Sequence, residues 1–225
     1  FLEEVGVDPG RFRIAFCTES PAGYPIAPDC VTAVENAARL CEDLGHHVEQ
    51  VPIHYDWESY IRVLWDYWAF ANCDVTSFKE VQYKTGRCVS PETLEPATLR
   101  MMDHYNQLTV DSLSVAMKTL VTIGGQVGEW HNNWDVLLTP VALSPAPPLG
   151  TLWRADATRE NAMTLEQQIW QVGPYTPISN TSGQPSMSVP LHQTDSGLPV
   201  GVLCTASVGD EATLIRLAAQ LEQAC

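Results

Sequence analysis

Lysine is scarce in this chain, which holds only Lys79, Lys84 and Lys118 among its 225 residues. Twelve basic residues stand against 27 acidic ones, and the formal net charge is −15 at pH 7. A surface that binds nucleic acid needs clustered Lys and Arg to neutralise phosphates, and an anionic membrane surface attracts the same residues. The composition therefore argues against a nucleic-acid partner and against a membrane partner.

Long apolar runs and metal-ligand spacings are missing as well. No run approaches the roughly 20 apolar residues that a membrane-spanning helix needs. The seven cysteines, an odd number, show no C-x-x-C or comparable spacing. Such a pattern favours reduced thiols over a secreted disulfide framework, so we expect a cytoplasmic protein that holds no metal.

Motifs that would mark a catalytic or nucleotide-binding centre are also absent. No G-x-S-x-G sequence occurs, and a Ser-His-Asp or Cys-His arrangement is assembled by geometry, so spacing cannot reveal it. Gly124, Gly125 and Gly128 lie close together, but no strand precedes them as a dinucleotide-binding loop would require. Close helix packing or a helix end is the favoured interpretation.

The elements that are present indicate an α/β fold. Residues 13–17 are strand-like, residues 28–44 have apolar side chains at helical spacing and are followed by Gly45, and residues 48–53 alternate as a second strand. A strand, a helix and a strand within about 40 residues predict a parallel βαβ unit.

The pattern continues along the rest of the chain. Residues 57–130 are helical and aromatic, residues 135–139 are typical of a strand buried on both faces, and residues 163–172 predict a short helix. Residues 186–190 and 200–206 then predict an antiparallel hairpin.

A last helix is expected to begin at Asp210, which is a good N-cap residue. No linker is long enough to divide the chain, so residues 1–225 are expected to form a single domain segment.

Short motifs follow one another in a fixed order over most of the chain. They are Leu44 to Glu49, Asp135 to Pro140, Pro145-Ala146-Pro147, Pro177 to Pro185, and Leu198 to Gly201. Each motif alone is weak. The ordered set resembles the later half of the amidase-signature hydrolases, a family that cleaves amide bonds.

The resemblance implies the C-terminal half of the amidase-signature fold, a mixed β-sheet flanked by helices on both faces. Family members cleave amides with a serine nucleophile, a second serine in a cis peptide, and a lysine. No segment of this chain matches the Gly/Ser-rich motif that carries this centre, so we assign no catalytic residue and expect the centre in a preceding half. Ser182 is interpreted as structural. The chemistry uses only side chains and backbone groups, so no cofactor is expected.

The residues expected to bind substrate come from two segments. In the family, the stretch just before Asn180 lies near the bound acyl group, which makes Thr176, Ile178 and Ser179 candidates; the competing interpretation is a plain strand lead-in. Cys73, among aromatic and small residues, suits the wall of an apolar pocket. A buried cysteine that packs as a small hydrophobe is the favoured interpretation.

We therefore predict an amide hydrolase that acts on small linear or cyclic amides, with residues 1–225 supplying scaffold and part of the substrate pocket. Its partners would be the preceding N-terminal half and a small-molecule amide, and a homodimer is left open. Two alternatives remain. One is a non-catalytic binding module derived from the amidase fold, and the other is a cysteine hydrolase centred on Cys73, which would need a histidine within hydrogen-bond reach.

Overall fold

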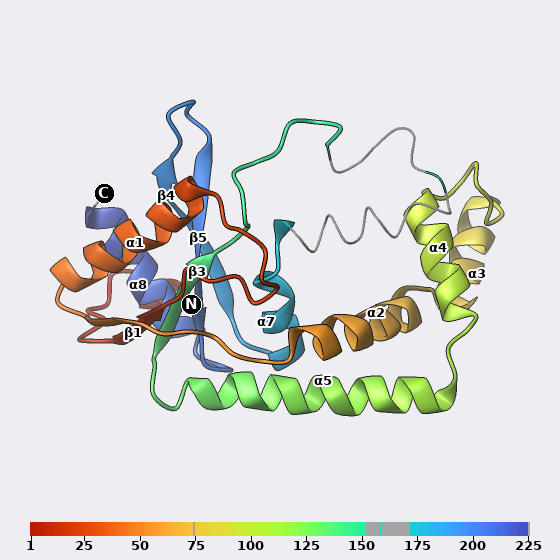
Figure 1. Cartoon of the computed structure of the whole chain (residues 1–225), viewed down its shortest axis with the longest axis horizontal. Coiled ribbons are helices and arrows are strands. Elements are labelled where there is room, and N and C mark those ends of the chain that lie inside the picture. Colours follow the sequence, from red (N-terminus) through yellow and green to blue (C-terminus); the bar gives the residue numbers. More distant parts are fainter. Residues whose placement is uncertain (74, 152–157, 159–171, 225) are drawn as a thin grey trace. The chain divides into compact units, whose positions relative to one another are not determined.

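A computed structural model describes residues 1–73, 75–151, 158 and 172–224 (Figure 1). The helix predicted over residues 163–172 lies almost wholly outside the described residues. The chain divides into two compact units. The first, which we call the sheet unit, comprises Phe1–Tyr55, Ile123–Pro147 and Gln171–Cys225; the second, the helical unit, comprises Asp56–Thr122 and Pro148–Trp170.

A mixed five-stranded sheet with the order β2-β1-β3-β5-β4 forms the centre of the sheet unit. β1 (Arg13–Phe16) runs parallel to both β2 (His47–Gln50) and β3 (Val136–Pro140). β5 (Pro199–Ala206) runs antiparallel to β3 and to β4 (Ser186–Gln193). The parallel βαβ pairing and the antiparallel hairpin predicted from the sequence are confirmed.

Two strands differ in length from their predictions. β2 stops at Gln50 instead of residue 53, because its partner β1 ends at Phe16. β4 continues past Pro190 to Gln193, with a shift in pairing register between Val189 and His192. A strand accommodates proline at such an irregularity, because the missing N–H is not needed for the ladder there.

Two helices pack on one face of the sheet, α1 (Pro28–Asp43) and α8 (Glu211–Ala224). α1 ends as predicted, since Gly45 has a φ of +97°, a left-handed conformation that glycine adopts without steric cost. The short 3-10 helix η1 (Leu2–Glu4) is tied to α8 by Arg216, whose Nε donates to Glu4 Oε2 at 2.7 Å. The buried core of this layer includes Ile14, Val34, Cys41, Val136, Leu138, Val202, Cys204, Leu214, Leu217 and Leu221.

The opposite face of the sheet carries α7 (Thr176–Ser182) and the C-terminal end of α5 (Val110–Trp130). The sheet thus has helices on both faces, which confirms the predicted α/β architecture. The side chains that point to this second face alternate with core residues along β3 and β5. They are Leu137, Thr139, Leu203 and Thr205.

α7 is a helix where the competing interpretation had a strand lead-in. Pro177 lies in its first turn, where the missing N–H is no loss. Gly183 ends it with a φ of +76° and donates its N–H to the Ser179 carbonyl oxygen at 2.9 Å. The segment before β4 therefore projects its side chains around a helix instead of alternating them as a strand would.

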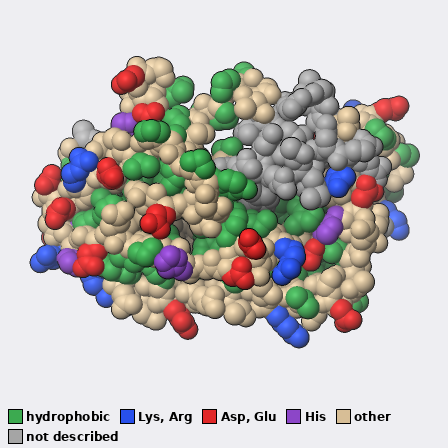
Figure 2. Space-filling view, in the orientation of Figure 1, with side chains coloured by type: hydrophobic (Ala, Val, Ile, Leu, Met, Phe, Trp, Pro, Cys, Tyr) green, Lys and Arg blue, Asp and Glu red, His purple; other side chains and the backbone are tan. Residues whose placement is uncertain are grey.

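The helical unit consists of α2 (Trp57–Cys73), α3 (Val75–Thr85), α4 (Pro96–Tyr105) and most of α5, as predicted for residues 57–130. Across the parts of the chain that the structure describes, no helix is both long and apolar enough to cross a membrane. On the face shown in Figure 2, acidic side chains lie scattered among fewer basic ones, in keeping with the net charge of −15.

Candidate functional site

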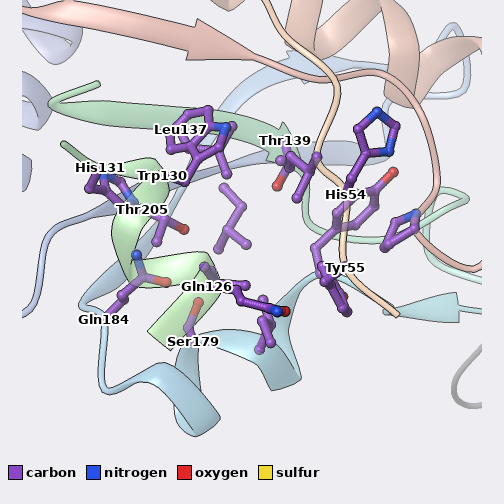
Figure 3. A pocket seen from close by; sticks show the side chains of 16 residues that line it. His54, Tyr55, Gln126, Trp130, His131, Leu137, Thr139, Ser179, Gln184 and Thr205 are labelled. Carbon is purple, nitrogen blue, oxygen red and sulfur yellow. The ribbon is translucent and has the colours of Figure 1, made fainter. Parts of the chain in front are cut away.

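A pocket that is partly open to solvent lies on the second face of the sheet, within the sheet unit (Figure 3). β3 and β5 form its floor, and α7 and the end of α5 form its walls. Aromatic and aliphatic side chains dominate the lining, among them Tyr55, Trp130, Leu137, Tyr175 and Leu203. None of the described lining residues is Lys, Arg, Asp or Glu. Apolar pockets with a few placed polar groups are typical ligand sites.

Three hydroxyls from three different elements form a hydrogen-bonded chain at the wall of this pocket. Ser186 Oγ of β4 donates to Ser179 Oγ of α7 at 2.7 Å and lies 2.9 Å from Thr205 Oγ1 of β5. A hydroxyl has one proton, and Ser186 gives its own to Ser179, so Thr205 donates to Ser186. The proton of Ser179 is then available for an acceptor in the pocket.

A buried N–H group in the same lining, Trp130 Nε1, has no hydrogen-bond partner among the described residues. Gln184 is only 6% exposed, and its side-chain amide lies 2.7 Å from Ser182 Oγ. An unpaired buried donor costs about 1–3 kcal/mol. An occupant that offers acceptor oxygens would remove that cost. Ser182 is the last residue of α7, and its Oγ donates to the Ile178 carbonyl oxygen of the same helix at 2.9 Å.

His131, at the end of the pocket next to Trp130, is a neutral side chain at pH 7. Burial lowers its pKa below the ordinary value of 6.5, and this outweighs the carbonyl of Trp134 and the charges of Asp135 and Asp210, which act to raise it. Its Nδ1 lies 3.1 Å from the Trp134 carbonyl oxygen and must donate to it. The lone pair of the neutral ring is therefore on Nε2.

We expect the free energy of unfolding to decrease between pH 7 and pH 5 because of His131. Its folded-state pKa lies below the unfolded value of about 6.5, so the unfolded chain binds the proton first. The contribution is fully present above pH 6.5 and is lost as the pH falls through the folded pKa. Urea unfolding at pH 7.5, 6.5 and 5.5 measures this, and a His131→Gln variant should show a shallower decrease than the natural chain.

The nearby carboxylate of Asp135 does not contribute to the decrease in stability between pH 7 and pH 5. Burial acts to raise its pKa, but hydrogen bonds from the Arg13 side chain and backbone, at 2.7 Å, and the Arg13 charge outweigh burial and lower the pKa below 3.8. Its contribution is present above about pH 4 and is lost only at lower pH. A decrease between pH 7 and pH 5 that is identical in the natural chain and in His131→Gln would contradict the assignment to His131.

The structure places the four candidate substrate-binding residues differently. Ile178 and Ser179 both line the pocket on the sheet, whereas Thr176 is exposed at the start of α7 and is not among the described lining residues. Cys73 lies in the helical unit, 2% exposed, and lines a separate pocket with residues such as Tyr105. The structure therefore brings Ile178 and Ser179 together and leaves Cys73 in the other unit.

The environment of Cys73 does not favour a nucleophile. Burial raises the pKa of its thiol to about 11, so it is protonated at neutral pH, whereas a reactive cysteine is a thiolate. No histidine is among the described residues that line its pocket. Within the described ranges there is also no cluster of three or more His, Cys, Asp or Glu side chains that could hold a metal ion.

Sequence reasoning missed several polar residues of the pocket on the sheet. Thr139 and Thr205 carried a usable signal, because each is a polar residue within an otherwise apolar strand. Gln184, Trp130 and His131 carried none, since only the packing of α5 and α7 on the sheet brings them to one pocket.

Comparison with known proteins gives the family. The amidase family model matches residues 1–215. The chain is 29% identical over 234 residues to 6-aminohexanoate-cyclic-dimer hydrolase of Paenarthrobacter ureafaciens, across 100% of this chain and 46% of that protein. It is 28% identical over 232 residues to the protein of the same name from Pseudomonas sp. (strain NK87), again across 100% of this chain and 46% of that protein.

The solved structure of 6-aminohexanoate cyclic dimer hydrolase superposes with a TM-score of 0.83 at 26% identity, covering 99% of this chain and 47% of that one. The chain thus spans about half the length of these relatives. Because the family model matches nearly all of residues 1–225, the chain belongs to the amidase-signature family.

Proposed function

We propose that the chain is the later half of an amide hydrolase that acts on small linear or cyclic amides. The family match over residues 1–215 carries this proposal. The names of the two bacterial relatives add the substrate class, because a cyclic dimer of 6-aminohexanoate is a small cyclic amide. Since the chain spans 46% of those proteins, the activity is proposed for the longer protein that it completes.

The Ser-cisSer-Lys centre would lie in the preceding half. A neutral lysine would draw a proton through the bridging serine and so activate the nucleophilic serine for attack on the amide carbonyl. Backbone N–H groups of the same half would stabilise the oxyanion that develops. The three lysines of this chain, Lys79, Lys84 and Lys118, are in no matching motif. Residues 1–225 would contribute scaffold and pocket wall.

Substrate contacts from this half are assigned to Thr176, Ile178, Ser179 and Cys73. Ile178 and Ser179 are supported by their place in an apolar pocket that suits the aliphatic part of a small amide. Thr176 is supported by its exposed position three residues before Ser179 on α7. Cys73 is supported by its protonated, buried thiol, which would serve as apolar wall.

The two compact units would belong to one amidase domain that the preceding half completes, and a homodimer of the whole protein remains part of the proposal. A cytoplasmic location is supported by the thiols. Cys17, Cys30, Cys41, Cys73, Cys88 and Cys204 are all free in the described ranges, as expected in a reducing compartment.

A hybrid protein tests the function. The preceding half of the Paenarthrobacter hydrolase is joined to Phe1. Cleavage of one amide bond of the cyclic dimer of 6-aminohexanoate adds one water and gives the linear dimer, which is followed by mass spectrometry. We expect the hybrid to hydrolyse the dimer, and both the chain alone and a hybrid without its nucleophilic serine to be inactive. A hybrid that melts cooperatively but has no activity would favour the non-catalytic binding module. Hydrolysis by the chain alone, abolished in Cys73→Ala, would favour the cysteine hydrolase.

A further inference from the structure

We propose that α5 holds a hinge at residues 122–125, about which the helical unit turns relative to the sheet unit. Such a motion goes beyond the proposed hydrolysis, because it belongs to residues of this chain and requires no catalytic centre. Three features coincide at residues 122–125: the boundary between the two compact units, a pair of glycines, and a threonine whose side chain weakens the helix.

The boundary between the two units falls inside a helix. α5 spans Val110–Trp130, and the chain passes from the helical unit to the sheet unit between Thr122 and Ile123. Among the described helices and strands, α5 alone belongs to both units, whereas the crossings at residues 55–56 and 147–148 lie in irregular segments. Irregular segments change conformation readily, but a helix bends sharply only at a local cause such as glycine. α5 therefore controls how far the units can turn.

Two adjacent glycines follow the boundary. Glycine is less favourable than alanine inside a helix, because its backbone loses more conformational freedom when the helix forms. Gly124 has a packing reason, since a Cβ there would lie 3.1 Å from the Thr181 carbonyl oxygen of α7. Gly125 has no such reason, since a Cβ there would meet no atom of the described residues within 4 Å. What glycine adds at position 125 is a backbone that leaves the helical conformation at low cost.

The residue just before the boundary weakens the same turn of the helix. Thr122 Oγ1 donates to the Lys118 carbonyl oxygen at 2.9 Å. In a regular helix this oxygen is the acceptor of the Thr122 backbone N–H, so the hydroxyl competes for it. Threonine side chains that bond in this way slightly destabilise helices and often bend them. Thr122 and Gly125 thus lie within one turn of α5, and both favour a bend there.

The two sides of α5 differ at this turn. On one side Ile123 is 4% exposed, and Gly124 lies against the backbone of α7. On the other side Val121 is 73% exposed, and Gly125 is exposed as well. The end of α5 is therefore anchored in the sheet unit, while the exposed side leaves room for a bend.

A hinge at this place would change the separation of the proposed substrate contacts. Ile178 and Ser179 belong to the sheet unit, and Cys73 belongs to the helical unit. Hinge closure around a ligand commonly commits the substrate and excludes water during a reaction. This consequence rests on the proposed function, whereas the hinge itself rests on α5 alone.

Distances between two spin labels on residues 1–225, measured by double electron–electron resonance, test the hinge. Cys88 is exposed while the other free cysteines of the described ranges are buried, so it takes a label in the helical unit. Glu35→Cys adds a label at an exposed position of α1 in the sheet unit, and Cys225→Ser removes the seventh cysteine. With the natural hinge we expect a broad distribution of distances. Gly125→Ala and Thr122→Val together should narrow it by about twofold, because each removes a cause of bending.

Gly128→Ala is the matched control. It makes the same chemical change in the last turn of α5, where the Gly128 carbonyl oxygen accepts from the His131 N–H at 3.1 Å and the helix ends. A Cβ there also meets no atom of the described residues within 4 Å. Gly128 lies beyond the anchor at Gly124, so this variant should keep the distribution as broad as it is with the natural hinge.

Two results would overturn the proposal: a distribution of unchanged width when Gly125→Ala and Thr122→Val are combined, or an equal narrowing in Gly128→Ala. Thr122 and Gly125 are both exposed, so neither change disturbs the core. No activity enters the measurement, so an inactive hybrid leaves the hinge standing. An unchanged distribution beside an active hybrid would refute the hinge alone.

Discussion

Leu217→Ala is expected to be about 2–5 kcal/mol less stable than the natural chain. Leu217 is 0% exposed and lies on α8, where it packs into the core between the helices and the sheet. Truncation removes the transfer free energy of the buried methyl groups and leaves a cavity that the surrounding helices and strands fill only in part. Since a domain is stable by only about 5–15 kcal/mol, this single change would remove a large share of the total. Urea unfolding measures it as a lower midpoint.

Two control variants separate the cavity from other causes. Leu149→Ala makes the same chemical change at a fully exposed position and should alter the free energy of unfolding by no more than about 0.5 kcal/mol. Leu217→Met keeps most of the volume and should cost less than about 1.5 kcal/mol. If Leu217→Ala unfolded at the same urea concentration as Leu149→Ala, α8 would not be packed on the sheet as the structure has it.

Local signals explain why much of the fold could be predicted. α1 has Pro28 in its first turn and Gly45 just past its end, and its buried residues recur at helical spacing. All of these signals lie within one short segment, so the segment alone predicts the helix and its bounds. The β4–β5 hairpin is likewise local, since its turn lies at Asp195 to Gly197. β3 could be predicted because a short, mostly apolar run is typical of a strand that is covered on both faces.

α7 was not predicted because local signals conflict there. The helix is only seven residues long, too short for a helical period to stand out, and Pro174 and Pro177 favour extended backbone before them. The bond from the Gly183 N–H to Ser179 and the packing of the helix beside the sheet decide the outcome. Tertiary packing commonly overrides propensity in short helices.

The pocket depends on pairings that no local pattern encodes. Ser186 and Thr205 are opposite each other because of the hairpin register, and only this register brings their hydroxyls to 2.9 Å. Ser179 joins them through the placement of α7, seven residues before Ser186. The family resemblance led to Ile178 and Ser179 because it identified the segment, but the place of Gln184 in the pocket required the fold.

Gly124→Val is expected to lower the free energy of unfolding by about 1–3 kcal/mol, the usual cost of overpacking. A Cβ at Gly124 of α5 would lie 3.1 Å from the Thr181 carbonyl oxygen and 3.3 Å from the Ser182 Cα, both on the backbone of α7. Backbone atoms cannot rotate away as a side chain can, so α7 must shift. Ser179, which lines the pocket, lies on α7 and shifts with it. This close approach agrees with the helix-packing interpretation of the glycine cluster.

Gly125→Val is the matched control, one residue along the same helix, since a Cβ there meets no atom within 4 Å. Valine has a somewhat higher helix propensity than glycine, so this variant should be as stable as the natural chain or slightly more stable. The difference in urea midpoint between the two variants isolates the contact with α7 from the change in propensity. Equal midpoints would mean that α5 and α7 are not in contact at Gly124 as the structure has them.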